Sequence, residues 1–352
     1  MNQILIGDCL AILPTLPGAS VQCCVTSPPY WGLRDYGTAQ WEGGDEECDH
    51  KRFNAYSSGL QGSKESTYNS KFEKLICGKC GARRIDAQLG LESTPEEYVA
   101  NMVHVFREVW RLLKEDGTCW INIGDSYASN PASGGQQSDL MTGGEHKRTP
   151  HNGYQRPAGL KPKDLCGIPW RLAFALQADG WYLRSDIIWH KPNPMPESVT
   201  DRPTKSHEYV FLLTKQERYF YDAEAIREPC GNDTHSRGNG TSPKHDGIFD
   251  PNVKNALNFQ RYQPDNRNKR SVWTVATQPY KESHFATFPE DLIKPCIMAG
   301  SRLGDIVLDP FAGSGTTGKV AIELGRRPLL IELNPAYAEL ARNRTNVTAG
   351  ML

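Results

Sequence analysis

Short apolar runs alternate along this chain with segments of helical periodicity. The compact apolar runs are typical of strands that are buried on both faces of a sheet. They occupy residues 2–7, 21–26, 119–123, 305–309 and 329–332. Other segments have apolar residues three and four positions apart, which is typical of helices that pack on one face. These segments are residues 94–116, 168–178, 289–298 and 317–324. This alternation predicts an α/β fold with a doubly wound, mostly parallel sheet.

The first of these helices has clear end signals. Thr94 precedes Pro95 and is followed three residues later by Glu97, which is a capping pattern, and Gly117 is the predicted stop. Two further runs, at residues 181–189 and 208–214, are predicted to pair as strands and complete one edge of the sheet.

Three stretches lack the aliphatic residues that a core needs. They are residues 37–88, which also hold cysteines, residues 129–163, and residues 222–272, which hold a basic cluster. We interpret them as insertions and loops added to the α/β core.

The strongest local signal is a strand, a glycine-rich turn and a helix that follow one another from Asp309. The turn reads Asp-Pro-Phe-Ala-Gly-Ser-Gly-Thr-Thr-Gly. Backbone N–H groups at such a helix start bind nucleotide-like ligands. A P-loop is disfavoured because Val320 stands where a magnesium-binding hydroxyl is needed. A dinucleotide site stays open, since Glu332 lies where a ribose-binding carboxylate belongs.

Charge favours S-adenosylmethionine over NAD as the ligand of this turn. The ammonium and sulfonium groups of S-adenosylmethionine are cationic, whereas the pyrophosphate of NAD is anionic. Asp309 at the entrance of the turn suits a cation, and Glu332 can accept hydrogen bonds from ribose hydroxyls. NAD remains the alternative.

A second motif, Ser27-Pro28-Pro29-Tyr30, directly follows the run at residues 21–26. A hydroxyl and a backbone carbonyl can accept the two N–H bonds of an exocyclic base amine, while an aromatic ring stacks on the extruded base. Two prolines fix φ and stiffen the loop. Together the two motifs indicate methylation of a base amine, although the tetrapeptide alone also fits a plain proline turn.

The chain resembles the permuted β class of DNA amino-methyltransferases, in which the catalytic motif precedes the cofactor motif. Here residues 26–32 match the catalytic motif and residues 309–318 match the cofactor motif. Smaller matches lie at residues 7–8, 169–191, 206–214 and 284–292. The resemblance implies a circularly permuted methyltransferase fold that uses S-adenosylmethionine.

Roles for individual residues follow from this resemblance. It implies that Ser27 and the Pro28 carbonyl hold the amine, that Pro29 belongs to the same rigid catalytic loop, and that Tyr30 stacks on the base. It places around the cofactor Asp8, Phe288, Pro289, Asp309, Phe311, Gly313, Gly315, Thr316, Thr317 and Glu332.

The resemblance also divides the chain. It implies a catalytic domain of residues 1–36, 89–215 and 284–352 and a loop-rich DNA-recognition region at 216–283. The insertion at 37–88 follows from composition instead, because members of the class commonly lack it. Candidate DNA contacts, for which packed or solvated loops are the alternative, are Trp31, Arg34, Tyr36, Arg261, Arg267, Lys269 and Arg270.

Serine at the first catalytic position accompanies mostly cytosine N4 methylation in the resembled class, and aspartate or asparagine mostly adenine N6. We therefore expect site-specific methylation of cytosine N4 in DNA, with base flipping, in a restriction–modification setting. Adenine N6 is the alternative. An NAD-dependent oxidoreductase and a noncatalytic zinc-containing DNA-binding protein are the rivals from other classes.

Residues 37–88 contain a candidate metal site. Cys48-x-His50 and Cys77-Gly-x-Cys80 supply four ligands that suit tetrahedral zinc, and they predict a zinc-ribbon-like insertion. The spacing of the first pair is tight, so a chance grouping of reduced thiols is the alternative.

Composition narrows the setting. Forty Lys and Arg against 41 Asp and Glu give no global positive field, so a DNA surface must be local. Neither a leader pattern at residues 1–8 nor an apolar run of roughly 18 residues is present. We expect a cytoplasmic protein that binds DNA and no membrane; a monomer and a homodimer are both compatible with the sequence.

Overall fold

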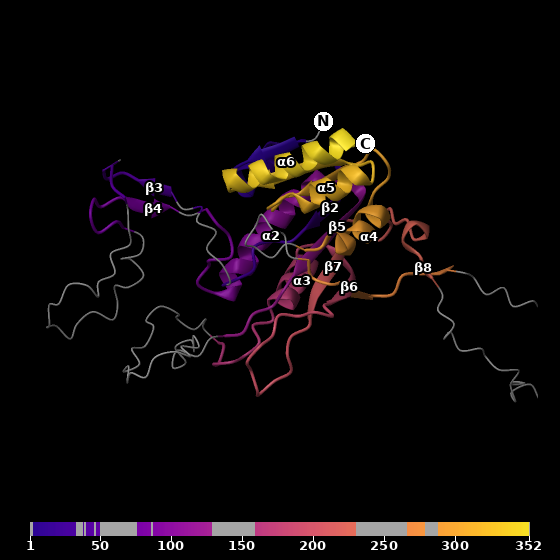
Figure 1. Cartoon of the computed structure of the whole chain (residues 1–352), viewed down its shortest axis with the longest axis horizontal. Coiled ribbons are helices and arrows are strands. Elements are labelled where there is room, and N and C mark those ends of the chain that lie inside the picture. Colours follow the sequence, from indigo (N-terminus) through magenta and orange to yellow (C-terminus); the bar gives the residue numbers. More distant parts are fainter. Residues whose placement is uncertain are drawn as a thin grey trace, which may run out of the picture.

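The computed structural model describes residues 3–32, 38, 40–45, 47–49, 76–85, 87–128, 159–229, 266–278 and 288–351. Within these residues the main sheet has eight strands in the order β1-β12-β11-β2-β5-β7-β6-β10. Helices lie on both sides of it (Figure 1).

Parallel pairing dominates this sheet. Its strands are β1 (Gln3–Ile6), β2 (Val21–Thr26), β5 (Leu113–Ile123), β6 (Tyr182–His190), β7 (His207–Thr214), β10 (Val272–Thr274), β11 (Ile306–Asp309) and β12 (Arg327–Glu332). Neighbours are parallel except at β7, which is antiparallel to β5 and β6. The prediction of a mostly parallel α/β sheet is confirmed, and so is the pairing of β6 with β7. The prediction that these two strands form the edge was wrong, because β10 pairs with the outer side of β6.

The helices divide between the two faces. They are α1 (Cys9–Ile12), α2 (Pro95–Leu112), α3 (Ile168–Ala178), α4 (Glu290–Gly300), α5 (Thr316–Glu323) and α6 (Pro335–Met351), with short 3-10 helices η1 (Leu13–Thr15) and η2 (Glu224–Ile226). Helices α2 and α3 share a core with Cys24 and Leu308, whereas α4 and α5 share one with Cys23 and Val307. Since alternate strand residues point to opposite faces, these two cores explain the continuous apolar runs.

Helix α2 begins as predicted but ends earlier. The Thr94 hydroxyl accepts a hydrogen bond from the N–H of Glu97 at 3.1 Å. The predicted stop at Gly117 was wrong, because the helix ends at Leu112 and Gly117 lies inside β5. A Cβ at Gly117 would come within 3.1 Å of the Gln22 carbonyl, so close strand pairing explains this glycine.

The adjacent strands β11 and β2 form a topological switch point. After β11 the chain passes through α5 to β12 on one side, and after β2 it passes through α2 to β5 on the other. Ligands of α/β proteins bind outside the carboxyl ends of the strands at such a point. The Thr26 hydroxyl at the end of β2 donates to the Asp309 carboxylate at the end of β11, over 2.6 Å. Both sequence motifs therefore start from neighbouring strand ends.

Two small sheets stand beside the main one. Strands β3 (Gln40–Glu42) and β4 (Arg83–Ile85) pair antiparallel, as do β8 (Glu228–Pro229) and β9 (Asn266–Arg267). Figure 1 draws β3 and β4 at one side, away from the main sheet. Of the helices in the described part of the chain, none has the length and apolar character that crossing a membrane requires.

The predicted recognition region at residues 216–283 is partly built into the main sheet. Strand β10 lies inside this range and pairs with β6, and its Trp273 is buried in the core. The polar composition of the surrounding residues concealed this three-residue strand, since its pattern is too short to mark a strand by itself.

Candidate active site

The predicted catalytic loop, residues 27–30 and called the catalytic loop below, leaves the carboxyl end of β2 and is held by its neighbours. The hydroxyl of Tyr98, in the first turn of α2, donates to the Pro29 carbonyl at 2.9 Å. The indole N–H of Trp31 donates to the Glu92 carbonyl at 3.0 Å. These contacts add to the restriction that two prolines already place on the backbone of this loop.

Two predicted DNA contacts that follow the loop lie outside the described residues, namely Arg34 and Tyr36. The third, Trp31, is only 5% exposed and packs in the core on the α2 side. Its burial argues against the predicted DNA contact and gives it a packing role.

The Tyr30 hydroxyl lies at the centre of a polar network. It is 2.6 Å from Oε2 of Glu208 and 3.2 Å from Oδ1 of Asn122. Asn122 donates to the same Glu208 oxygen at 3.2 Å, and Lys191 forms an ion pair with the other oxygen. Burial raises the pKa of Tyr30 well above its usual range, and the charge of Glu208 raises it further. Tyr30 therefore stays neutral and donates its proton to a hydrogen bond with Glu208.

A glycine makes room for the Tyr30 ring. A Cβ at Gly124 would lie 2.7 Å from Cε2 of Tyr30 and 3.4 Å from the carboxyl carbon of Glu208. Sequence reasoning missed Gly124, Asn122, Lys191 and Glu208 as site residues. The only local signal was a polar residue, Asn122, inside an otherwise apolar run.

The glycine turn follows β11 as predicted, and its glycines have different roles. Gly313 has φ +52°, and a Cβ there would meet nothing within 4 Å, so its conformation leaves open space at the turn. Gly315 has φ +80°, and a Cβ there would lie 2.7 Å from Cβ of Ala341 in α6. Gly315 thus serves the packing of the turn against α6.

Glu332 lies at the carboxyl end of β12, next to the turn. Its two oxygens accept the backbone N–H groups of Gly313 at 2.7 Å and Asn334 at 2.8 Å. Burial raises its pKa. Each carboxylate oxygen can accept a second hydrogen bond, so both can still receive ligand hydroxyls.

Asp8 lies beside Glu332, because β1 pairs with β12 in the register Ile6 to Glu332. Its carboxylate caps α1 by accepting the N–H of Leu10 at 2.9 Å. Glu332 and Asp309 thus end two neighbouring strands and Asp8 lies just beyond the end of a third, all on the side of the catalytic loop.

Asp309 is 1% exposed, and its carboxylate is used within the protein. It accepts hydrogen bonds from the hydroxyls of Thr26 at 2.6 Å and Thr317 at 2.7 Å, and from the N–H of Phe311 at 3.1 Å. Burial raises the pKa of Asp309 to about 6. These contacts make it the joint between the two loops; the predicted contact with a ligand cation stays a prediction.

Thr316 and Thr317 are both buried, and both hydroxyls have protein partners. Thr316 accepts a hydrogen bond from Arg344 at 3.1 Å, and Thr317 donates to Asp309. These contacts argue against the predicted cofactor contacts through their hydroxyls, because the helix start directs both side chains inward.

Phe288 and Pro289 lie just before α4, whose first residue is tied to the helices around the turn. The Glu290 carboxylate accepts hydrogen bonds from Lys319 of α5 at 2.7 Å and from Arg344 of α6 at 3.1 Å. This arrangement is compatible with the predicted position of Phe288 and Pro289 near the cofactor.

The basic cluster of the predicted recognition region is paired with an acid. Arg267 and Arg270 donate to Glu228 at 2.8 and 2.6 Å, and Lys269 lies 5.1 Å from the centre of the Trp273 ring. Burial raises the pKa of Glu228, but the hydrogen bonds from both arginines outweigh it and lower the pKa. The fourth predicted contact here, Arg261, lies outside the described residues.

Three thiols of the predicted insertion lie together. The Sγ atoms of Cys48, Cys77 and Cys80 are within 4.8 Å of one another, and those of Cys48 and Cys77 are 3.8 Å apart. Tetrahedral zinc with Zn–S bonds of about 2.3 Å places two sulfurs about 3.8 Å apart. His50, the fourth predicted ligand, lies outside the described residues. The thiol arrangement thus fits zinc.

The backbone around these thiols is folded tightly. The N–H of Gly81 donates to the Cys77 carbonyl at 2.8 Å, and the N–H of Cys77 donates to the Ala82 carbonyl at 2.7 Å. A Cβ at Gly44 would lie 2.8 Å from Sγ of Cys80, so this glycine lets the two segments meet.

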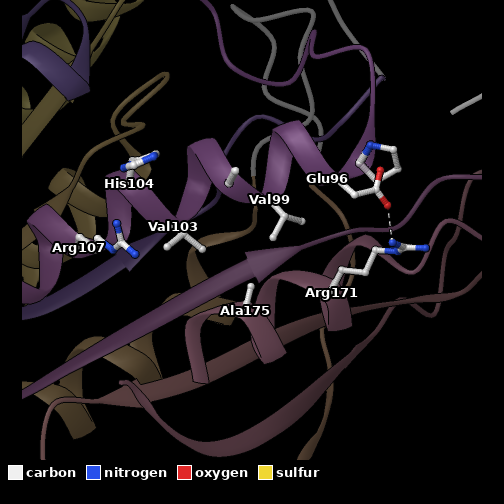
Figure 2. Close-up of a pocket in the computed structure, with 9 residues that line it drawn as sticks. Glu96, Val99, Val103, His104, Arg107, Arg171 and Ala175 are labelled. Atoms are coloured by element: carbon white, nitrogen blue, oxygen red, sulfur yellow. Dashed lines mark hydrogen bonds and ion pairs between the residues drawn. The ribbon is translucent and has the colours of Figure 1, made fainter. Parts of the chain in front are cut away.

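A groove with a volume of about 360 Å³ lies between α2 and α3, and its lining includes none of the site residues described above. Figure 2 shows Val99 and Val103 of α2 facing Ala175 of α3 across it. Its charged rim is paired internally, since Arg171 contacts Glu96 at 2.8 Å. No predicted site residue lines this groove, so it is not part of the candidate active site.

Comparison with known sequences adds independent information. The N6/N4 methyltransferase family model, described as DNA methylase, matches residues 21–343. The type II methyltransferase M.Cfr9I of Citrobacter freundii is 44% identical over 342 residues, which cover 96% of this chain and 85% of the relative. M.SmaI of Serratia marcescens, also a type II methyltransferase, is 42% identical, covering 97% of this chain and 90% of the relative.

Solved structures share the fold. The PvuII DNA methyltransferase (cytosine-N4-specific) aligns with a TM-score of 0.56 and 17% identity, covering 98% of this chain and 86% of that one. A putative DNA modification methylase of Thermus thermophilus, TTHA0409, complexed with S-adenosyl-L-methionine, aligns with a TM-score of 0.53 and 22% identity, covering 100% and 96%.

Proposed function

Because the chain belongs to the N6/N4 DNA methylase family, we propose that it transfers a methyl group from S-adenosylmethionine to N4 of cytosine at a specific site in DNA. This membership confirms the resemblance that the two motifs indicate. It favours methyl transfer over an NAD-dependent oxidoreductase and over a noncatalytic DNA-binding protein.

One observation carries the proposal: the catalytic loop and the glycine turn leave adjacent strand ends that a buried hydrogen bond joins. Thr26 and Asp309, the donor and acceptor over 2.6 Å, are the last residues of β2 and β11. An amine held at Ser27 and a ligand held at the turn therefore belong to one site at the switch point.

The residues around the turn fit a cationic ligand with a ribose. Glu332 keeps accepting capacity on both oxygens, Asp8 adds a second carboxylate, and Gly313 leaves open space. Lys319 and Arg344, the basic residues that flank this helix start, are paired with Glu290. When bound, S-adenosylmethionine supplies an electrophilic methyl group on a sulfonium. Transfer is favoured because the rest of the cofactor leaves as a neutral thioether.

The catalytic loop binds and orients the base. The Ser27 hydroxyl and the Pro28 carbonyl accept the two N–H bonds of the amine, which turns its lone pair toward the methyl group. Tyr30, fixed by Glu208 and neutral, offers its ring for stacking. Because these acceptors are fixed before the base arrives, little ordering is needed at the moment of reaction.

Serine in the first catalytic position supports cytosine N4 over adenine N6. Type II methyltransferases among the relatives support action at a defined DNA sequence. The region of residues 216–283, with Arg267, Lys269 and Arg270, is the proposed site of target recognition, where these cations contact phosphate.

The test is incubation of the protein with DNA and methyl-labelled S-adenosylmethionine, followed by digestion to nucleosides and mass spectrometry. Label in N4-methylcytosine is the expected result. Label in N6-methyladenine would replace the proposed base, and unlabelled DNA would refute the proposed activity.

We also propose structural zinc in the insertion, held by Cys48, Cys77 and Cys80 with His50 as the fourth ligand. The sulfur spacing of 3.8 Å and the tightly folded backbone of residues 77–82 support it. Such a site holds together a segment with little apolar surface to bury.

A further inference from the structure

The loop of residues 191–206, which joins β6 to β7, leaves the sheet beside the catalytic loop. At one end Lys191 pairs with Glu208, the residue that accepts the Tyr30 hydroxyl at 2.6 Å. At the other end the Lys205 ammonium donates to the Asp125 carbonyl at 3.0 Å, just beyond β5. Both ends of the loop are thus fixed at the edge of the sheet that carries the candidate active site.

This loop is stiff. Asn193 exchanges two hydrogen bonds with the backbone of Thr277, at 2.9 and 3.3 Å. The Glu197 carboxylate accepts from the Arg202 guanidinium at 2.7 Å and from the N–H of Lys205 at 3.2 Å. Prolines at positions 192, 194 and 196 further restrict the backbone between these anchors.

An apolar side chain stands at the centre of this stiff segment. Met195, between two prolines, is 85% exposed, more than any other large hydrophobic residue in the described ranges. Exposure of this much apolar surface is unfavourable in water, and the anchors at Asn193 and Glu197 hold the backbone on both sides of this side chain. The protein therefore keeps an apolar side chain in water on a loop whose first residue, Lys191, is linked through Glu208 to Tyr30.

We propose that Met195 is a wedge that enters the DNA base stack when the target nucleotide is extruded; this inference rests on the proposed function. Extrusion leaves a gap between the neighbouring bases, and methionine is among the apolar side chains that proteins insert between base steps. Residues 191–206 then act as a rigid arm. The link from Lys191 through Glu208 to Tyr30 sets the distance between the wedge and the platform for the extruded base.

The test compares two kinds of DNA. Sequencing of methylated host DNA first maps the site of the wild-type protein, and synthetic duplexes then carry the target cytosine either paired with guanine or opposite an abasic position. Met195→Ala should lower kcat/KM about tenfold or more on the paired duplex, because the wedge replaces lost stacking. It should change little on the abasic duplex, in which extrusion costs less.

Two variants serve as controls. Met195→Leu keeps an apolar side chain and should retain most activity on the paired duplex. Leu303→Ala removes another exposed apolar side chain, 78% exposed and far from residues 191–206 in sequence, and should have no effect. In addition, 2-aminopurine placed next to the target should brighten less with Met195→Ala than with the wild type.

An equal loss on both duplexes, or no loss on either, would overturn the wedge while the wild type still methylates. Failure of the wild type to methylate any cytosine would instead overturn the proposed function. The two failures are therefore distinguishable.

Discussion

Ser27 is the residue on which the proposed chemistry depends most directly. Replacing Ser27 with Ala removes one acceptor of the amine, so we expect kcat to fall about 10²-fold or more. Affinity for S-adenosylmethionine, measured by calorimetry, should stay unchanged. The matched control is Ser20→Ala, next to the opposite end of β2, where the hydroxyl only bonds the Pro17 carbonyl at 2.7 Å. A parallel loss of cofactor affinity would assign Ser27 a different role.

We expect Glu208 to act through Tyr30, from whose hydroxyl it accepts a hydrogen bond, rather than on the substrate. In Glu208→Gln the charge that pairs with Lys191 is lost and the Tyr30 hydroxyl is held less firmly, so kcat should fall about tenfold with little change in KM. In a Tyr30→Phe background the same change should add little, because the hydroxyl is absent. Additive losses in this double-mutant cycle would show that Glu208 acts independently of Tyr30.

Substitution of Asp309 can show whether its carboxylate mainly joins the two loops or also binds a cation of the ligand. Its pKa of about 6 lies above the ordinary value of 3.8, so the folded state holds the proton more strongly than the unfolded chain. The cost of its ionisation is absent below pH 3.8 and grows as the pH rises toward 6.

Asn at this position avoids that cost. Its amide oxygen can accept from Thr26 and from the N–H of Phe311, and its NH2 group can donate to the Thr317 hydroxyl. Thr317 then turns its own proton to the Val25 carbonyl, 3.3 Å away. We expect Asp309→Asn to be more stable than the wild type above pH 6, by up to about 3 kcal/mol, and the difference to shrink toward pH 4. Urea unfolding at pH 5 and pH 8 measures it. A large loss of S-adenosylmethionine affinity in the same variant would support the predicted cation contact.

Individual residues also mark the limit of sequence reasoning about the site. Ser27, Tyr30 and Glu332 are recognisable because each adjoins a distinctive local motif. Asn122, Gly124 and Glu208 are not, because the pairing of β2 with β5 and of β5 with β7 brings them to Tyr30. Asp309 and Thr317 were recognised as part of the turn, but their inward hydrogen bonds depend on β2, which is distant in sequence.

At the scale of elements, the insertion that carries Cys48, Cys77 and Cys80 gives a prediction about zinc content. Purified protein should contain about one zinc per chain, and Cys80→Ser should lose most of it. The control is Cys296→Ser, because this buried residue of α4 bonds the Leu292 carbonyl, which a serine can also do. Zinc measured by mass spectrometry at wild-type level in Cys80→Ser, or far below one per chain in the wild type, would contradict the proposed site.

Elements with local signals were predicted well, and those defined by distant partners were not. Thr94 and Glu97 mark the start of α2 within one turn, so the sequence suffices there. Its end depends on Leu113, which pairs with Val21 in a neighbouring strand. Likewise β10 exists because Trp273 is buried beside β6, and nothing in its own three residues requires a strand.

At the scale of the whole molecule, the order of elements along the chain differs from their order in the sheet. The first strand, Gln3–Ile6, pairs with the last, Arg327–Glu332, and β2 pairs with β11. Each half of the site therefore needs segments from both ends of the described chain.

The hydrogen bond between Thr26 and Asp309 spans 283 positions of sequence. During translation the catalytic tetrapeptide leaves the ribosome long before its partner strand β11 has been made. A nascent chain arrested before residue 309 should therefore be unable to modify the host chromosome. We expect methylation to await the synthesis of β11, so that shorter products of synthesis cannot place stray marks.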